Sequence, residues 1–211
     1  MKIMWRKSFL LILSMTLLSG CSLATIRTID EDRLAKEGFS AANYVSGIWE
    51  SDFIPTLQDN AVEITQLLSE LDANENAATE QYGNRTSTGA YSFMVSGEAQ
   101  VLLINRESRV GLAELDLAPY DGTADIYLAI GPVLRGNALR DAVGFIAFND
   151  FTNQVEFAQV SDALKDRVDS DVLGQTDIDD LVGDTIQFLG AFSLDDRAEI
   201  VIMPVRLEVV E

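Results

Sequence analysis

Polar side chains with the chemistry of a small-molecule site gather near the middle of the chain, at Arg135, Arg140, Asp141, Asn149, Asp150, Asn153 and Gln154. A planar guanidinium beside carboxylate and amide groups can hold a polyol or a sugar through paired hydrogen bonds. Phenylalanines in the same stretch could supply a face for stacking: Phe145, Phe148, Phe151 and Phe157. Residues 131–160 therefore carry a hypothetical site for a small polar solute or a protein partner.

The same residues also fit ordinary structural roles. Asn149 or Asp150 could cap the helix that follows, and Arg140 could pair with Asp141 or Asp150. The phenylalanines would then belong to the core. Caps and core explain most of these residues without a ligand, so both interpretations stay open. If the stretch is a site, the double substitution Arg140→Ala and Asn149→Ala should abolish binding and leave the fold intact.

The composition argues against most catalytic chemistry. The chain has no histidine, which excludes Ser-His-Asp triads and imidazole bases. It has no GxxxxGK[ST] or GxGxxG motif, and its one cysteine cannot build a usual zinc site. A hydrolase based on paired carboxylates is the remaining enzymatic option, but no pair can be singled out among 34 acids. We therefore expect a protein that is not an enzyme and has no cofactor.

Two groups of acidic residues could attract Ca²⁺. The first is Asp116, Asp121 and Asp125, and the second is Asp177, Asp179 and Asp180. Neither group has the spacing of an EF-hand loop, with its glycine at position six and glutamate at position twelve. We expect these residues to be solvated acids of loops, without a metal.

The N-terminus has the pattern of a lipoprotein signal peptide over residues 1–20. A basic start precedes an apolar run that is too short to span a bilayer, and Leu18-Ser19-Gly20-Cys21 forms a lipobox. Cleavage before Cys21 would allow lipidation of its thiol, and the acyl chains would anchor the protein to a membrane. Residues 21–38 would be the lipidated cysteine and a tether. Ser22 in place of aspartate favours the outer membrane, at the periplasmic face of the envelope.

The charge of the mature chain excludes nucleic acid as a partner. Cleavage removes three of the 15 basic residues and none of the 34 acidic ones, which leaves 12 against 34 and a net charge of −22. Binding to nucleic acid relies on basic side chains that displace counterions from phosphates. The membrane is therefore contacted through the lipid alone.

Residues 39–89 are expected to form an N-terminal helical segment. Pro55 suits the first turn of a helix whose apolar face recurs with helical periodicity at Leu57, Ala61, Ile64, Leu68 and Leu71. A short second helix is predicted over residues 75–82, with Gly83 after it. The segment around Trp49 is expected to dock onto the core as a helix or turn.

Residues 90–211 have the pattern of an α+β domain. Strands are predicted at 90–105, 110–117, 124–130, 185–192 and 199–210, and Gly97 marks a bulge or bend in the first. A helix with Phe157, Val160, Leu164 and Val168 on one face lies between the third and fourth strands. This order is that of the OB-fold, a closed five-stranded β-barrel with its helix between strands three and four. The alternative is an open α+β sheet with the same elements.

Several segments resemble the DUF2291 family of predicted periplasmic lipoproteins over most of the mature chain. They include NYVSGIW, GAYSFMVSGEAQV, RGNALRDA, FNDFTNQVEFA and MPVRLEVV. The resemblance implies a lipid-anchored bacterial protein whose genes neighbour those of sugar-type ABC uptake systems. It implies no catalytic residue.

Two functions follow as expectations. The first is a non-enzymatic accessory of solute uptake, which binds a small polar solute or docks onto a component of an ABC transporter. The alternative is an envelope structural or assembly lipoprotein that contacts other proteins through an exposed edge of the barrel. Substitutions in the last strand, and not those in the central stretch, would disable this second function.

Overall fold

A computed structural model describes residues 38–86 and 89–210 of the chain. The predicted signal peptide, the predicted lipidation site Cys21 and the predicted tether up to residue 37 lie outside the described residues. The chain divides into residues 1–40 and residues 41–211, and the following description concerns the second unit. Within it, the helical segment and the strands form one compact body.

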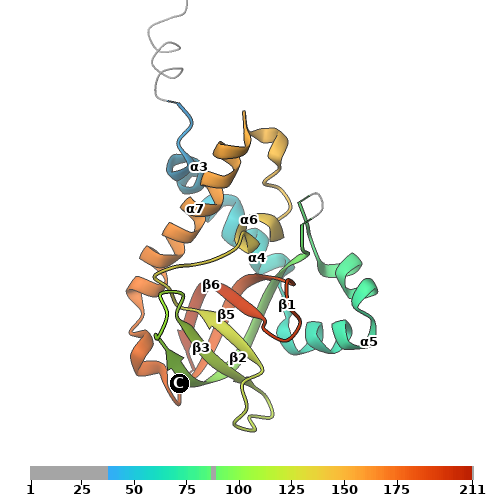
Figure 1. The fold of residues 1–211 in the computed structure, drawn as a ribbon, viewed down its shortest axis with the longest axis vertical. Coiled ribbons are helices and arrows are strands. Elements are labelled where there is room, and N and C mark those ends of the chain that lie inside the picture. Colours follow the sequence, from blue (N-terminus) through green and yellow to red (C-terminus); the bar gives the residue numbers. More distant parts are fainter. Residues whose placement is uncertain (1–37, 87–88, 211) are drawn as a thin grey trace, which may run out of the picture. The chain divides into compact units, whose positions relative to one another are not determined.

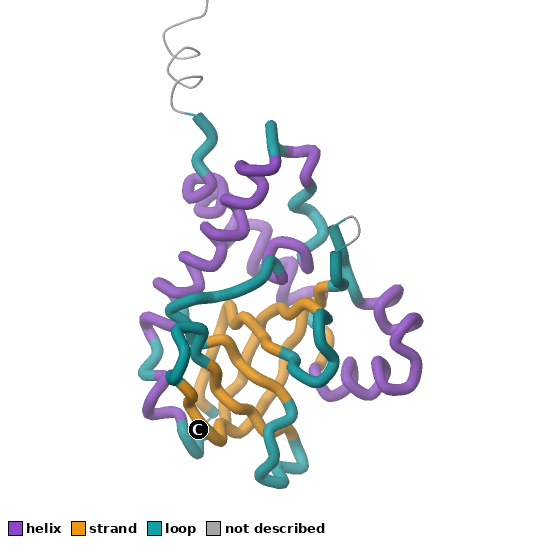
Figure 2. The backbone as a smooth tube through the Cα atoms, in the orientation of Figure 1, coloured by secondary structure: helices purple, strands orange, loops and turns teal. Residues whose placement is uncertain are grey.

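Five strands close into a barrel in the order expected of an OB-fold. They are β2 (Ser92–Asn105), β3 (Leu112–Leu117), β4 (Ile126–Ala129), β5 (Thr185–Ser193) and β6 (Val201–Val209). The sheet runs β2-β3-β4-β6-β5, and β2 also pairs with β5, which closes the ring. The single parallel contact in the ring joins β4 to β6 at Tyr127 and Leu128. Figure 2 shows the strands gathered in one barrel with the helices outside it.

The long strand β2 pairs with both β5 and β3 because each partner pairs with a different part of it. Residues Ser92 to Gln100 of β2 pair with β5, whereas the pairing with β3 begins at Ala99. Of the bulge or bend expected at Gly97, the bulge is absent, since the register with β5 is continuous there and the shift in β2 lies between Val101 and Leu103. Gly97 instead admits close neighbours: a Cβ atom would lie 2.6 Å from Cγ2 of Ile64.

The N-terminal segment is helical but is divided differently from the prediction. It consists of α3 (Ala41–Ile48), the π-helix η1 (Trp49–Phe53), α4 (Ile54–Asn60), the short strand β1 (Val62–Glu63) and α5 (Ile64–Tyr82). Trp49 is buried and stacks on Phe53, as its expected docking role requires. Non-helical backbone at Asn74 divides α5, so the short helix predicted over residues 75–82 is also present.

The single helix predicted from Pro55 onward is wrong. Helix α4 ends at Asn60, the backbone at Ala61 is extended, and β1 pairs in parallel with Val95 and Ser96 of β2. Leu57 and Ile64 are both fully buried on either side of this break, which is why the apolar spacing reads as one continuous helix. Pairing with a distant strand has overridden the local helical pattern.

Helix α7 (Gln154–Asp171) lies between β4 and β5 along the chain, as predicted. Its expected apolar face is buried, with Phe157, Val160, Leu164 and Val168 all in the core. The shorter α6 (Ala138–Ala142) was not predicted, and it packs against β2, β5 and α7. Helix α3 packs against α7, so the start of the N-terminal segment lies beside the helix of the central stretch, whereas α5 lies against β2 (Figure 1).

Glu63 caps the N-terminus of α5 and makes the stability of this helix depend on pH. Its carboxylate accepts hydrogen bonds from the amide of Gln66 and the hydroxyl of Thr65. Burial is the largest influence on the pKa of Glu63 and would raise it, but these hydrogen bonds, together with those from backbone amides, outweigh burial and lower the pKa.

The capping contribution of Glu63 is therefore present in full above the ordinary pKa of glutamate and is lost as the pH falls through the lowered value. We expect the wild-type protein to exceed Glu63→Gln in stability at neutral pH, with the difference shrinking between about pH 6 and about pH 3. Urea unfolding of both proteins across this range measures the difference. A difference that does not change with pH would show that the ionised carboxylate is not the cap.

Candidate functional site

A pocket of about 280 Å³ lies on the outer face of the barrel, over strands β3, β4 and β6. Its floor is apolar and comes from Leu112, Ala129, Val201 and Met203, with Val110 beside them. Successive side chains of a strand point to opposite faces, so these residues alternate with Ala113, Leu128 and Ile202, which are buried. Apolar residues at outward positions of three adjacent strands thus form a surface suited to a ligand.

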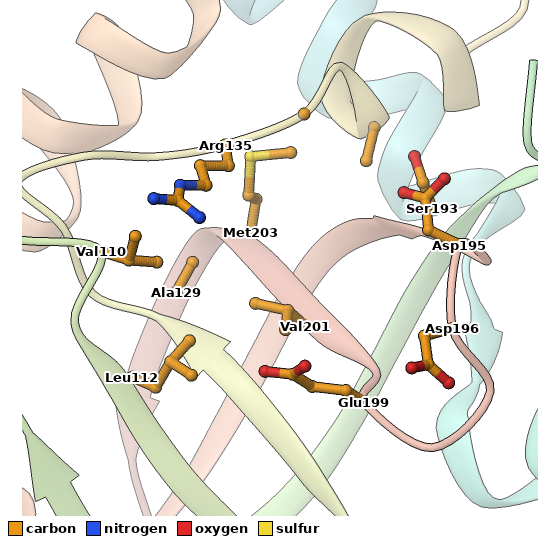
Figure 3. Close-up of a pocket in the computed structure, with 12 residues that line it drawn as sticks. Val110, Leu112, Ala129, Arg135, Ser193, Asp195, Asp196, Glu199, Val201 and Met203 are labelled. Atoms are coloured by element: carbon orange, nitrogen blue, oxygen red, sulfur yellow. The ribbon is translucent and has the colours of Figure 1, made fainter. Parts of the chain in front are cut away.

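Two connections form the walls of the pocket. One is residues 131–137, which lead from β4 to α6 and carry Arg135. This connection is held to the neighbouring loop by a hydrogen bond from the amide of Val133 to the carbonyl oxygen of Arg109, at 3.0 Å. The other wall is the β5–β6 connection, with Asp195, Asp196 and Glu199. Figure 3 shows Arg135 on one side of the floor and Asp195 and Asp196 on the other.

Most charges around this floor have no protein partner. Within the described part of the chain, the side chains of Arg135, Asp195 and Glu199 make no hydrogen bond or ion pair. Asp196 accepts one hydrogen bond from the amide of Ala198 at 2.8 Å, which shapes its own turn. By contrast, Arg106, Arg140 and Arg197 each pair with an aspartate elsewhere. The rim of the pocket therefore offers one guanidinium and three carboxylates to a ligand.

Of the residues predicted for the site, only Arg135 lines this pocket. Arg140 and Asp141 lie in α6 and form a buried pair, in which Nε and Nη2 of Arg140 both donate to Oδ1 of Asp141 at 2.8 Å. The same oxygen accepts a hydrogen bond from the hydroxyl of Thr86, and Arg140 also donates to the carbonyl oxygen of Phe157. These contacts fasten α6 to the neighbouring loop and to α7, which is a structural role.

The remaining predicted residues lie at the start of α7. Asn153 is the N-cap, since its Oδ1 accepts from the amides of Val155 and Glu156 at 2.9 and 3.0 Å. The cap predicted at Asn149 or Asp150 is therefore wrong. Asp150 instead accepts from the amide of Ala147 and closes a short 3₁₀ turn. Asn149 and Gln154 are exposed. The structure thus does not bring the predicted set together around the pocket.

Three of the four phenylalanines of the central stretch form a cluster beneath Arg140, whereas Phe145 is exposed and does not belong to the core. Phe157 is buried, and the rings of Phe148 and Phe151 lie 5.6 Å from it. The guanidinium of Arg140 stacks on the face of Phe157 at 3.7 Å from the ring centre. This cluster stabilises the junction of α6 and α7, and it does not face the pocket on β3, β4 and β6.

Comparison with known proteins identifies the family. Residues 11–208 match the family described as predicted periplasmic lipoprotein (DUF2291). The chain belongs to this family. The resemblance noted in the sequence is confirmed, and the DUF2291 family is one of periplasmic lipoproteins by that description. No curated protein matches the chain in sequence.

A solved structure is similar to this DUF2291 protein in fold. It is an OB-fold protein from Thermotoga maritima, with a TM-score of 0.68 and 18% sequence identity, and the match covers 82% of this chain and 99% of that one. At this identity the similarity concerns the fold alone. It confirms the predicted OB-like α+β class, in which the face of strands two and three, flanked by the loop between strands four and five, is a common ligand-binding surface.

Sequence reasoning missed the acidic wall of the pocket. Asp195 and Asp196 fall between the strands predicted at 185–192 and 199–210, and Glu199 begins the second of these, so none of them is predicted as a site residue. The available signal was the predicted fold, because the connection between the fourth and fifth strands of an OB-fold flanks its binding face. In the DUF2291 protein this connection is β5–β6, and it supplies every acidic residue of the rim.

The first group of acidic residues considered for Ca²⁺ shapes a loop, and in the second group Asp179 pairs with Arg106 at 2.7 Å. Asp116, Asp121 and Asp125 accept hydrogen bonds from the amides of Gly122, Thr123 and Leu117, respectively. Among the described residues, no group of three or more acidic or cysteine side chains is arranged to hold a metal ion. In the same part of the DUF2291 protein, no helix has the length and apolar character needed to cross a bilayer.

Proposed function

We propose that this DUF2291 protein is a lipid-anchored, non-enzymatic binding component at the periplasmic face of the envelope. It holds a small polar solute on the outer face of its barrel and serves an ABC-type uptake system. The anchor is the lipidated Cys21, and Ser22 after it directs the protein to the outer membrane. The family description supports the periplasmic lipoprotein. The uptake system comes from the family resemblance.

The pocket on β3, β4 and β6 is the observation that carries this proposal. Its volume of about 280 Å³ lies near the lower end of the range for small-molecule sites. An apolar floor with a few convergent polar groups is the usual composition of such sites. The unpartnered charges of Arg135, Asp195 and Glu199 can orient a ligand at little cost to the fold, because none of them stabilises another element.

Thermal unfolding of the full chain, purified in detergent, tests the proposal against a panel of sugars, polyols, nucleosides, amino acids and Ca²⁺. A ligand that binds only the folded state stabilises it by about 2.7 kcal/mol at a hundredfold excess over its dissociation constant. We expect one class of compound to raise the midpoint of the wild-type protein. The double variant Arg135→Ala and Glu199→Gln should lose this shift and keep the midpoint of the free protein.

Arg109→Ala is the matched control, since Arg109 is exposed on the neighbouring loop and does not line the pocket. It should respond to the ligand as the wild-type protein does. A shift that persists in the double variant would place the binding site elsewhere. No shift across the panel would reject the solute-binding function.

The alternative, an assembly lipoprotein, is favoured by the free edge of the last strand. In the described pairings, β6 contacts β4 only at Val201 and Ile202, whereas its pairing with β5 extends to Val209. Val209 and Val210 are exposed large apolar residues at the end of this strand. Such an edge can add a strand from a partner. Capture of an envelope protein that Leu207→Pro abolishes and the pocket variants leave unchanged would support this function.

A further inference from the structure

Opposite charges on the two walls of the pocket define the kind of ligand that it fits. Arg135 lies on residues 131–137, and Asp195 and Asp196 lie on the β5–β6 connection across the apolar floor (Figure 3). Glu199 comes from the same connection, two residues before Val201, and it lies beneath Val201 in Figure 3. A ligand that spans the pocket therefore meets a cation at one end and carboxylates at the other.

Charge balance argues against the two simplest ligand classes. The rim holds one guanidinium and three carboxylates, so a ligand with only negative charge would be repelled. A neutral sugar could form hydrogen bonds with the guanidinium and the carboxylates, but it would bring no opposite charge to either wall and would gain less than a ligand that does. A ligand with an ammonium group opposite the acids and a carboxylate opposite Arg135 balances both walls through charge-assisted hydrogen bonds.

The floor adds a requirement for apolar contact. Val201 and Met203 project from β6 between the two charged walls, and Met203 is almost fully covered. Methionine adapts its shape to different apolar groups. A body of a few carbon atoms between the charged ends would rest on these side chains. The volume of about 280 Å³ fits a single such unit better than a peptide or a nucleotide.

We infer that the ligand of this pocket is a free amino acid with an apolar or basic side chain. Arg135 binds its carboxylate, the acids of the β5–β6 connection bind its ammonium group, and its side chain packs on Val201 and Met203. A basic side chain further offsets the excess of negative charge on the rim. This inference rests on the proposed solute-binding function and departs from the sugar class that the family resemblance implies.

The test compares closely matched probes on the full chain in detergent, by isothermal titration and by the thermal midpoint. The probes are leucine, lysine, glutamate, leucinamide, N-acetylleucine, glucose and mannitol. Leucine and lysine should bind, with lysine at least as tight. Leucinamide lacks the carboxylate and N-acetylleucine lacks the ammonium group, so each should bind about tenfold more weakly than leucine, the effect of losing one charge-assisted hydrogen bond. Glutamate should bind more weakly still.

Substitutions in each wall test which end of the ligand that wall binds. Arg135→Gln should weaken leucine binding about tenfold and leave leucine and leucinamide with equal affinity, because the group that distinguishes them is gone. Asp195→Asn combined with Glu199→Gln should likewise remove the preference for leucine over N-acetylleucine. Arg109→Gln and Asp59→Asn are exposed controls outside the pocket and should change neither preference.

The outcomes separate this inference from the proposed function. Binding of glucose or mannitol that the Arg135 variant abolishes, without binding of amino acids, overturns the inference and keeps the solute-binding function. Equal affinity of the wild-type protein for leucine, leucinamide and N-acetylleucine also overturns it, since the charged walls would then not bind the carboxylate and ammonium groups of the ligand. No binding of any probe overturns both.

Discussion

Gly190→Ala is expected to lower the free energy of unfolding by about 3 kcal/mol or more, because overpacking at this position cannot be relieved by a side chain. Gly190 lies opposite Pro204 in the β5–β6 pairing, where the register between the strands shifts. A Cβ atom there would lie far inside van der Waals contact with the carbonyl oxygen of Met203, and 2.9 Å from Cγ2 of Ile202. The backbone of β6 would have to move, and Ile202 is fully buried in the barrel.

Urea unfolding measures this effect, and Gly47→Ala is the matched control. Gly47 lies within α3, and a Cβ atom there would meet nothing within 4 Å. Alanine in a helix is favoured over glycine by about 0.5–1 kcal/mol, so the control should be slightly stabilised. Equal stabilities of the two variants would show that β5 and β6 are less closely packed at Gly190 than the structure indicates.

The order of elements in the barrel could be predicted because it depends on local pattern. The helical face of Phe157 and Val160 and the turn around Gly122 are visible in a single sequence. The strand β1 could not be predicted, because only its pairing with Val95, far along the chain, makes it extended. The role of Gly97 was obscured for a similar reason, since Ile64 approaches it from another element.

The candidate site was predictable only in part. Arg135 could be selected by its residue type. Asp195 and Glu199 could not, because the sequence pattern of acidic loop residues is the same whether or not an apolar pocket floor lies beside them. That floor exists only once β3, β4 and β6 are adjacent. Whether Arg140 binds a ligand or has a structural role could be decided only from the positions of Thr86 and Phe157, which sequence spacing does not give.

Arg140→Ala is expected to destabilise the protein by about 3–5 kcal/mol, the usual cost of removing one partner from a buried ion pair. The side chain of Arg140 is 7% exposed and that of Asp141 is 16% exposed, so the carboxylate left behind would be poorly solvated. The substitution also removes the hydrogen bond to the carbonyl oxygen of Phe157 and the stacking on its ring. Arg140→Lys should recover only part of the loss, because an ammonium group cannot reproduce the planar, forked contact.

Arg106→Ala provides the control, because Arg106 pairs with Asp179 in a similar way but at the surface, with side chains 43% and 71% exposed. Exposed pairs contribute about 0–1 kcal/mol, so this variant should unfold nearly as the wild-type protein does. Similar losses in both variants would contradict the structural role of Arg140. A large loss in Arg140→Ala alone means that its double substitution with Asn149→Ala would disturb the fold, and binding must be tested through exposed Arg135 instead.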